Sequence, residues 1–548
     1  MLKRRAMSTP LNQLFNIHRR YHRSINLERD LGKPDAVEGY ILTERSLLAL
    51  ARILAALRDG NAHRAWTLTG VYGTGKSAFV HFLTSLCFPA DHPARAQALR
   101  IVQQVLPKGD PLWRPLWETI VSMPTSGLVP AVVTARQEPL TWTIVRALVR
   151  GADEFFPKHE RRSTLLKTLC DWDCEVALGR HTVQPQDILS VLKDLVEKAE
   201  APVLLVVDEL GKSLEYAAHH QGTEDLYLLQ QIAELSLQGE HQVYFLGLLH
   251  QSFAGYSDRL SATEQNEWVK VQGRFEDIPF SESSAQMLRL MGQVIYRGEP
   301  KSGTALKNPS STAQLHTSLE AEIQTWANQW FATLAPHLPQ GLSADLMAQI
   351  YPLHPLTGLV LPLLCQRYAQ NDRSLFTFLT SDEPQGFKAF LDSHHLRINL
   401  NQKTSKLELP TPELPSLQLP TLQLPQLYDY FVETVPGLAS RLNFQRWVEV
   451  KGLIEDAQHQ PPEVIRLLKT IGVLNLVGTS GNFRATPQHP APQCPLPPGF
   501  KGTLNHSGAR SVNFSGLAPS LWTRADFGLT RRIGSIGGYR HGRGCNDR

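Results

Sequence analysis

Short apolar runs alternate with stretches of helical periodicity in the first half of the chain. The runs are bounded by turns or polar residues and lie at residues 66–69, 128–134, 203–207 and 243–249, with a shorter one at 277–280. Between them, apolar positions recur three or four apart, as they do on one face of a helix. Strands that alternate with helices indicate βαβ units and a mostly parallel sheet, and uninterrupted apolar strands fit a sheet covered on both faces. The pattern therefore predicts an α/β fold with a parallel sheet flanked by helices.

The pattern around this core changes at both ends. Helical spacing within residues 47–57 belongs to an N-terminal adaptor segment, which we place at residues 1–60, ahead of a core at 61–281. After the core, helical periodicity without strands predicts an α-helical lid at 282–400. Its clearest helices are expected at residues 285–296, 319–334 and 359–368.

The C-terminal part of the chain divides into three segments. Leu-Pro repeats predict an extended linker at 401–426, because a proline every few residues blocks helix formation. Residues 427–486 combine helical spacing with an apolar run at 474–477 and a Gly-Thr-Ser-Gly turn, which suggests a hairpin and hence a winged helix. Residues 487–548 lose periodicity and are rich in Pro, Gly, Ser and Arg. We expect a disordered tail or an out-of-frame extension of a truncated protein.

Composition describes a multidomain globular chain. The 548 residues are 42% hydrophobic and 19% charged, and no run approaches the roughly 20 apolar residues that span a bilayer. No apolar signal segment follows the basic N-terminus, so we expect a cytoplasmic protein with no membrane partner. The six cysteines are scattered, which does not suggest a disulfide framework.

The positive net charge is confined to the tail. From Lys501 onward, eight Lys/Arg face Asp526 and Asp547, a net +6 that leaves −2 of the total +4 for the first 500 residues. The near-neutral body gives no compositional support for a protein that coats DNA, although a local basic patch would still allow DNA as a partner.

Residues 70–77, Gly-Val-Tyr-Gly-Thr-Gly-Lys-Ser, match the phosphate-loop pattern G-x-x-x-x-G-K-[ST] between an apolar strand and a helical stretch. Gly70, Gly73, Thr74 and Gly75 form the loop, and the glycines allow backbone N–H groups to converge on the β-phosphate. Lys76 should reach the β/γ-phosphates, and the Ser77 hydroxyl should hold Mg²⁺. The motif predicts an ATP site within a P-loop NTPase fold.

A second acidic motif completes this site. The strand at 203–207 ends in Asp208-Glu209, as in a Walker B motif. We expect Asp208 to hold the Mg²⁺ shell and Glu209 to orient and deprotonate the attacking water. The alternative is a core strand that ends in two solvated carboxylates. The following residues, 211–213, read Gly-Lys-Ser but lack the upstream glycine of a phosphate loop.

Three further positions are candidates for γ-phosphate contacts. His250 or Gln251, after the strand at 243–249, would act as a sensor if that strand lies between the two Walker strands. Arg274 precedes the strand at 277–280 as an arginine finger does, or it is salt-bridged at a strand start. Arg373, within Gln-Asn-Asp-Arg-Ser-Leu-Phe at 370–376, is a candidate lid arginine, with a surface ion pair as the alternative.

The chain resembles AAA+ ATPases of the origin-recognition and STAND-like clade, and within it large bacterial ATPases of phage defence, including BREX-type systems. The resemblance covers roughly residues 15–486 and depends on the motifs at 70–77, 207–216 and 370–376. It implies an AAA+-like core under a helical lid, with ATP and Mg²⁺ as cofactors. It also implies protein partners or self-assembly.

Two functions are compatible with these motifs. The first is an ATP-hydrolysing switch or motor in phage defence or DNA processing. The alternative is a STAND-like signalling or scaffold module that binds ATP with little turnover. Glu209 favours the first, because a binding module needs no general base.

Overall fold

The computed structural model describes most of the chain up to residue 478. The described residues are 7–18, 25–58, 64–71, 73–106, 110–111, 113–156, 164–180, 183–220, 223–237, 242–257, 260–297, 309–368, 375–398, 417–433 and 445–478. The tail at 487–548 lies outside these ranges, as do residues 401–416 of the Leu/Pro-rich segment.

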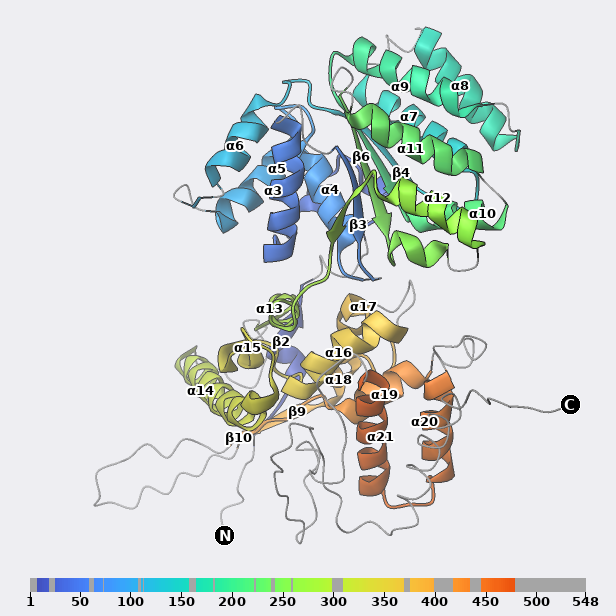
Figure 1. The fold of residues 1–548 in the computed structure, drawn as a ribbon. Coiled ribbons are helices and arrows are strands. Elements are labelled where there is room, and N and C mark those ends of the chain that lie inside the picture. Colours follow the sequence, from blue (N-terminus) through green and yellow to red (C-terminus); the bar gives the residue numbers. More distant parts are fainter. Residues whose placement is uncertain are drawn as a thin grey trace, which may run out of the picture.

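A five-stranded parallel sheet forms the centre of the upper part in Figure 1. Its order is β4-β5-β6-β3-β7, so β6 lies between β3 and β5. The strands are β3 (Ala65–Thr69), β4 (Val129–Thr134), β5 (Val203–Asp208), β6 (Val243–Leu249) and β7 (Glu276–Pro279). All five strands expected from the apolar runs are present, and the predicted α/β fold with a parallel sheet flanked by helices is confirmed.

Alternate residues of the strands face opposite sides of the sheet, and both sides are covered. In β6, Val243 and Phe245 belong to one buried cluster, whereas Tyr244 and Leu246 belong to the other. The first cluster is covered by α7 (Leu140–Phe155), α8 (Thr164–Ala177), α9 (Pro185–Ala199), α10 (Leu210–His219), α11 (Thr223–Leu237), η4 (Phe253–Tyr256) and α12 (Ala262–Gln272). The second is covered by α1 (Leu27–Asp30), α2 (Pro34–Val37), α3 (Glu44–Arg58), α4 (Lys76–Leu86), α5 (Pro93–Val105) and α6 (Trp113–Ser122). Burial on both faces explains why these strands read as uninterrupted apolar runs.

A second, mainly helical part follows the sheet and has its own buried cluster (Figure 1). Its helices are α13 (Ser284–Val294), α14 (Pro309–Leu334), η5 (Ala335–His337), α15 (Ala344–Gln349), α16 (Pro355–Tyr368), α17 (Leu375–Thr380), α18 (Phe387–Ser393), α19 (Leu424–Val432), α20 (Gln445–Asp456) and α21 (Pro462–Val477). Short strands accompany them: β8 (Ile295–Arg297), β9 (His395–Ile398) and β10 (Leu417–Gln418).

The N-terminal segment is shared between the two parts. β1 (Met7–Pro10) pairs with β9, and β2 (Phe15–Ile17) pairs with β8, with η1 (Leu11–Gln13) between them. Residues 27–58 instead pack on the sheet. The segment that we placed as one adaptor at 1–60 therefore contributes its first described residues to the helical part and the others to the core.

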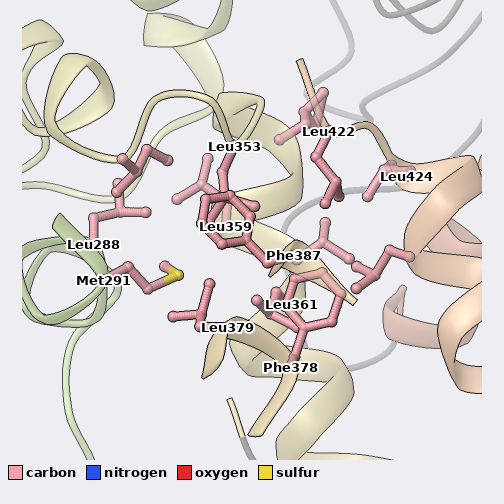
Figure 2. Close-up of a cluster of buried hydrophobic side chains, with 14 of the residues drawn as sticks. Leu288, Met291, Leu353, Leu359, Leu361, Phe378, Leu379, Phe387, Leu422 and Leu424 are labelled. Atoms are coloured by element: carbon pink, nitrogen blue, oxygen red, sulfur yellow. The ribbon is translucent and has the colours of Figure 1, made fainter. Parts of the chain in front are cut away.

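The end of the Leu/Pro-rich segment is packed rather than extended as a linker. β10 pairs with β9, and Leu422 and Leu424 are fully buried. Figure 2 shows both leucines in one cluster with Leu359, Phe378 and Phe387. Pro425 is compatible with helix α19 because it occupies the first turn, where its missing N–H has no helical partner. For residues 417–426, the expectation of a free linker was wrong.

The prediction of a hairpin in the C-terminal module was also wrong, because its expected first strand is helical. The apolar residues 474–477 form the last turn of α21, and Leu474, Leu476 and Val477 are buried in the cluster of the helical part. A buried helix end and a buried strand look alike over so short an apolar run. Arg367 and Tyr368, at the end of α16, both donate to the Leu476 carbonyl, at 2.6 and 3.2 Å. The helices within residues 445–478 thus share the buried cluster of the helical part.

Among the described residues, no helix combines the length and the hydropathy that crossing a bilayer requires.

Candidate nucleotide site

The phosphate loop and the acidic motif Asp208-Glu209 meet at the carboxyl ends of three neighbouring strands. Because β6 lies between β3 and β5, the residues after these strands share one edge of the sheet. The Gly70 amide, directly after β3, donates to the carbonyl of Leu249 at the end of β6, at 3.1 Å. Asp208 ends β5 on the other side of β6. Ligand sites of open parallel sheets lie at this edge.

The phosphate loop depends on three glycines. Gly73 and Gly75 have φ of 77° and 86°, in the left-handed region that favours glycine. Gly75 is the N-cap of α4, so the loop leads directly into a helix whose first N–H groups lack helical partners. A Cβ on Gly70 would lie 2.2 Å from the carbonyl oxygen of Phe280, so only glycine fits there. Thr74 closes the loop through a 2.9 Å hydrogen bond to the carbonyl of Val71.

Lys76 is buried inside this loop, with 5% of its surface exposed. Its ammonium donates to the carbonyls of Gly70 and Val71, the latter at 3.0 Å. Burial lowers the pKa of Lys76 to about 8, although the charges of Asp208 and Glu209 oppose this shift. An anionic phosphate beside this ammonium would offset the cost of burying its charge.

The two predicted Mg²⁺ ligands contact each other. The Ser77 hydroxyl donates to Asp208 Oδ2 at 2.9 Å, and burial raises the pKa of Asp208. A buried carboxylate beside a hydroxyl is an all-oxygen donor set, which suits a hard divalent cation that also binds substrate phosphates and water. The residues present therefore fit Mg²⁺.

Glu209 occupies an unusual backbone position between β5 and α10. Its φ is 52°, in the left-handed region, and it is the N-cap residue of α10. Strained positions of this kind cost on the order of 1–3 kcal/mol and cluster at functional sites. Its carboxylate forms an ion pair with Lys212, three residues along the chain. Since β5 ends at Asp208, Glu209 lies at the sheet edge.

At the end of β6 the two candidate sensors have different surroundings. His250 Nδ1 lies 3.4 Å from Lys76 Nζ, whereas Gln251 is exposed and its side chain lies over Gly255. Burial, followed by the positive charges of Lys76 and Lys212, lowers the pKa of His250 to about 3. A neutral His250 therefore faces the phosphate-loop lysine.

Of the two candidate arginines, the structure describes Arg274. Arg274 follows α12 and is paired with Glu234 of α11 at 3.2 Å. Since β7 is parallel to β3, with Pro279 beside Thr69, Arg274 precedes the end of β7 that lies away from the loop. It does not contact the phosphate loop of its own chain. Arg373 lies outside the described residues.

The sequence reasoning missed two residues of this region. Tyr256, in η4, accepts the His250 amide at 3.3 Å, and nothing in its sequence context indicated this. Lys212 was set aside with the Gly-Lys-Ser at 211–213. Its spacing of three residues from Glu209 on a helix is a signal that could have placed the two side chains together.

Comparisons with known proteins add little to this geometry. No protein-family model and no curated protein match the chain. Among solved structures, the chain is similar to the Aeropyrum pernix ORC2 protein in its ADPNP–ADP complexes, with 17% identity over 64% of this chain and 79% of that chain. The TM-score is 0.29, too low for an argument from that fold. The assignment of the fold therefore depends on the strand order and on the phosphate loop.

Proposed function

We propose that the chain binds Mg²⁺–ATP at residues 70–77 and hydrolyses it as an AAA+-like switch or motor. The observation that carries the proposal is the junction of Ser77 with Asp208 beside Lys76 and His250. This junction brings phosphate-binding, metal-binding and γ-phosphate-facing groups to one sheet edge. The P-loop and the strand order, with a strand between the two Walker strands, support the same conclusion.

Each group has a role in this reaction. The amides of the loop and Lys76 bind the β- and γ-phosphates. Ser77 and Asp208 would hold Mg²⁺, which would supply neutralisation of the charge that develops on the phosphate oxygens. Glu209 orients a water and takes its proton. The water oxygen bonds to the γ-phosphorus, the bond from that phosphorus to the bridging oxygen breaks, and ADP leaves with the electron pair. His250 acts as the sensor, in preference to Gln251.

The two arginines complete the proposal. Arg274 serves as a finger toward the nucleotide of a neighbouring copy, since it lies away from the loop of its own chain. Arg373 acts from the lid in cis. Both assignments depend on the sequence resemblance, as does the role in bacterial phage defence or DNA processing, with DNA and other proteins as partners.

The test is ATP turnover by the full-length protein, with and without DNA. We expect Lys76→Ala and Glu209→Gln to lose at least about 100-fold, since each removes a group that acts on the transition state. Lys270→Gln, on an exposed ion pair with Glu267, is the matched control and should retain the wild-type rate. Equal rates in all variants would remove the proposal.

A STAND-like module with little turnover is the second candidate. The ion pair between Lys212 and Glu209 favours it, because a base engaged by an ammonium is not free to activate water. Purified protein that retains ATP without turning it over would support this candidate. Turnover that depends on Glu209 would exclude it.

A further inference from the structure

Lys212 is a second lysine of the candidate site, although it belongs to no phosphate loop. Its ammonium pairs with the Glu209 carboxylate, and the side chains are 38% and 21% exposed. Both side chains of the pair are therefore partly exposed, and the pair is not locked in the core. An ammonium on a four-carbon stem can exchange one anion for another without movement of its backbone.

The backbone that carries Lys212 is fixed to the end of β6. A Cβ on Gly211 would lie 2.3 Å from Tyr256 Oη, and a Cβ on Gly247 would lie 2.5 Å from Leu210 Cδ2. Glycine at both positions thus allows the first turn of α10 to lie directly against η4 and β6. Tyr256 in turn accepts the His250 amide. These contacts hold the start of α10 next to the γ-phosphate-facing end of β6.

His250 links the two lysines. Its ring lies 3.4 Å from Lys76 Nζ, and its amide donates to Tyr256, which lies against Gly211, the residue before Lys212. Lys76 is the lysine that reaches the β/γ-phosphates in a phosphate loop. Glu209, the partner of Lys212, directly follows Asp208, which accepts the Ser77 hydroxyl, so the Lys212 ammonium lies at the sheet edge where a γ-phosphate would extend from the loop.

We propose that Lys212 exchanges the Glu209 carboxylate for the γ-phosphate of ATP, and so releases Glu209 only when a triphosphate is bound. The inference rests on the proposed function and adds the element that distinguishes ATP from ADP. A γ-phosphate carries more negative charge than a carboxylate and offers three acceptor oxygens, so it competes effectively for the ammonium. ADP has no group at this position and leaves the ion pair intact.

Binding of ADPNP and of ADP to the full-length protein, each with Mg²⁺ and measured by calorimetry, tests the exchange. Lys212→Gln should weaken ADPNP binding by at least about tenfold, the loss of one charge-assisted hydrogen bond, and leave ADP binding within about twofold. Lys212→Arg should restore much of the difference. Lys270→Gln, which removes an exposed lysine with the same spacing to a glutamate, should change neither.

A double-mutant cycle separates exchange from simple charge repulsion. Glu209→Gln should tighten ADPNP binding, because the carboxylate no longer competes for Lys212, and this gain should vanish in the Lys212→Gln background. An equal gain in both backgrounds would overturn the exchange, as would an unchanged ADPNP-to-ADP ratio in Lys212→Gln. Wild-type protein that binds neither nucleotide would overturn the proposed function as well. Unchanged ADP affinity in the variants reports that the site is still folded.

Discussion

Gly70, the first residue of the phosphate loop, has no room for a side chain. A Cβ built there lies 2.2 Å from the carbonyl oxygen of Phe280 and 3.2 Å from Thr74 Oγ1. The first contact is with backbone, which cannot rotate away as a side chain can. Phe280 N also donates to the Thr69 carbonyl, so the two segments are tied together.

The methyl group added by Gly70→Ala should therefore displace the loop, because its closest contact is with backbone and not with a side chain that could move to accommodate it. Ordinary van der Waals contact of a Cβ begins at 3.4 Å, so the loop and the segment at Phe280 must separate by about 1.2 Å. A misplacement of about 1 Å at reacting groups costs on the order of 100-fold in rate. We expect ATP turnover to fall by about that factor, with a smaller loss of nucleotide affinity, because several loop amides still face the phosphates.

Gly452→Ala is the matched control for this substitution. Gly452 lies within α20, and a Cβ there has no neighbour within 4 Å. Alanine should stabilise that helix by about 0.5–1 kcal/mol and leave turnover unchanged. Steady-state turnover, calorimetric binding and thermal melting of both variants separate the local effect from unfolding. A Gly70→Ala protein within twofold of the wild-type rate would refute the steric reasoning.

Three further predictions concern charge. The pKa of Lys76 is lowered to about 8, and phosphate binds the protonated form of this lysine. The affinity for ATP should therefore be constant below pH 8 and fall about tenfold per pH unit above it. In calorimetry, the ATP affinity of Lys76→Met should not change with pH. Ser77→Ala and Asp208→Asn should each raise the Mg²⁺ concentration for half-maximal turnover by about tenfold or more, whereas unchanged Mg²⁺ dependence would contradict their pairing as ligands. Asp225 accepts the Leu140 amide at the start of α7, and burial raises the pKa of Asp225 to about 6. Folding therefore takes up a proton, and the free energy of unfolding falls as pH rises from about 4 to 6. Asp225→Asn should remove this loss, a gain on the order of 3 kcal/mol at pH 7 that thermal melting at pH 4 and 7 would detect.

The sequence was informative where one interaction dominates the local structure. The five parallel strands are buried on both faces, so their apolar runs stand out against the helices, and the strand boundaries agree with the prediction to within one residue. The phosphate loop could also be predicted from the sequence, because Gly73 and Gly75 have backbone angles that only glycine adopts readily. Both signals are local, and each follows from the residues at the site itself.

Other features depend on contacts between distant segments, which periodicity does not report. The pairing of β1 with β9 joins residues nearly 400 positions apart, so the N-terminal segment could not be assigned to the helical part. The different surroundings of His250 and Gln251 likewise depend on Lys76, at the start of α4 and distant in the sequence. At Leu422, burial depends on helices that precede it, and composition alone suggested a linker.

The close contacts around the site explain how its parts act together. Gly70, Gly211 and Gly247 each lack the Cβ that would collide with Phe280, Tyr256 or Leu210. Each glycine thus allows one segment to pack directly on the next: the loop on the end of β7, and α10 on η4 and β6. Densely packed contacts of this kind transmit displacement because there is no void to absorb it. A γ-phosphate that draws on Lys212 or His250 would therefore act on segments already in contact.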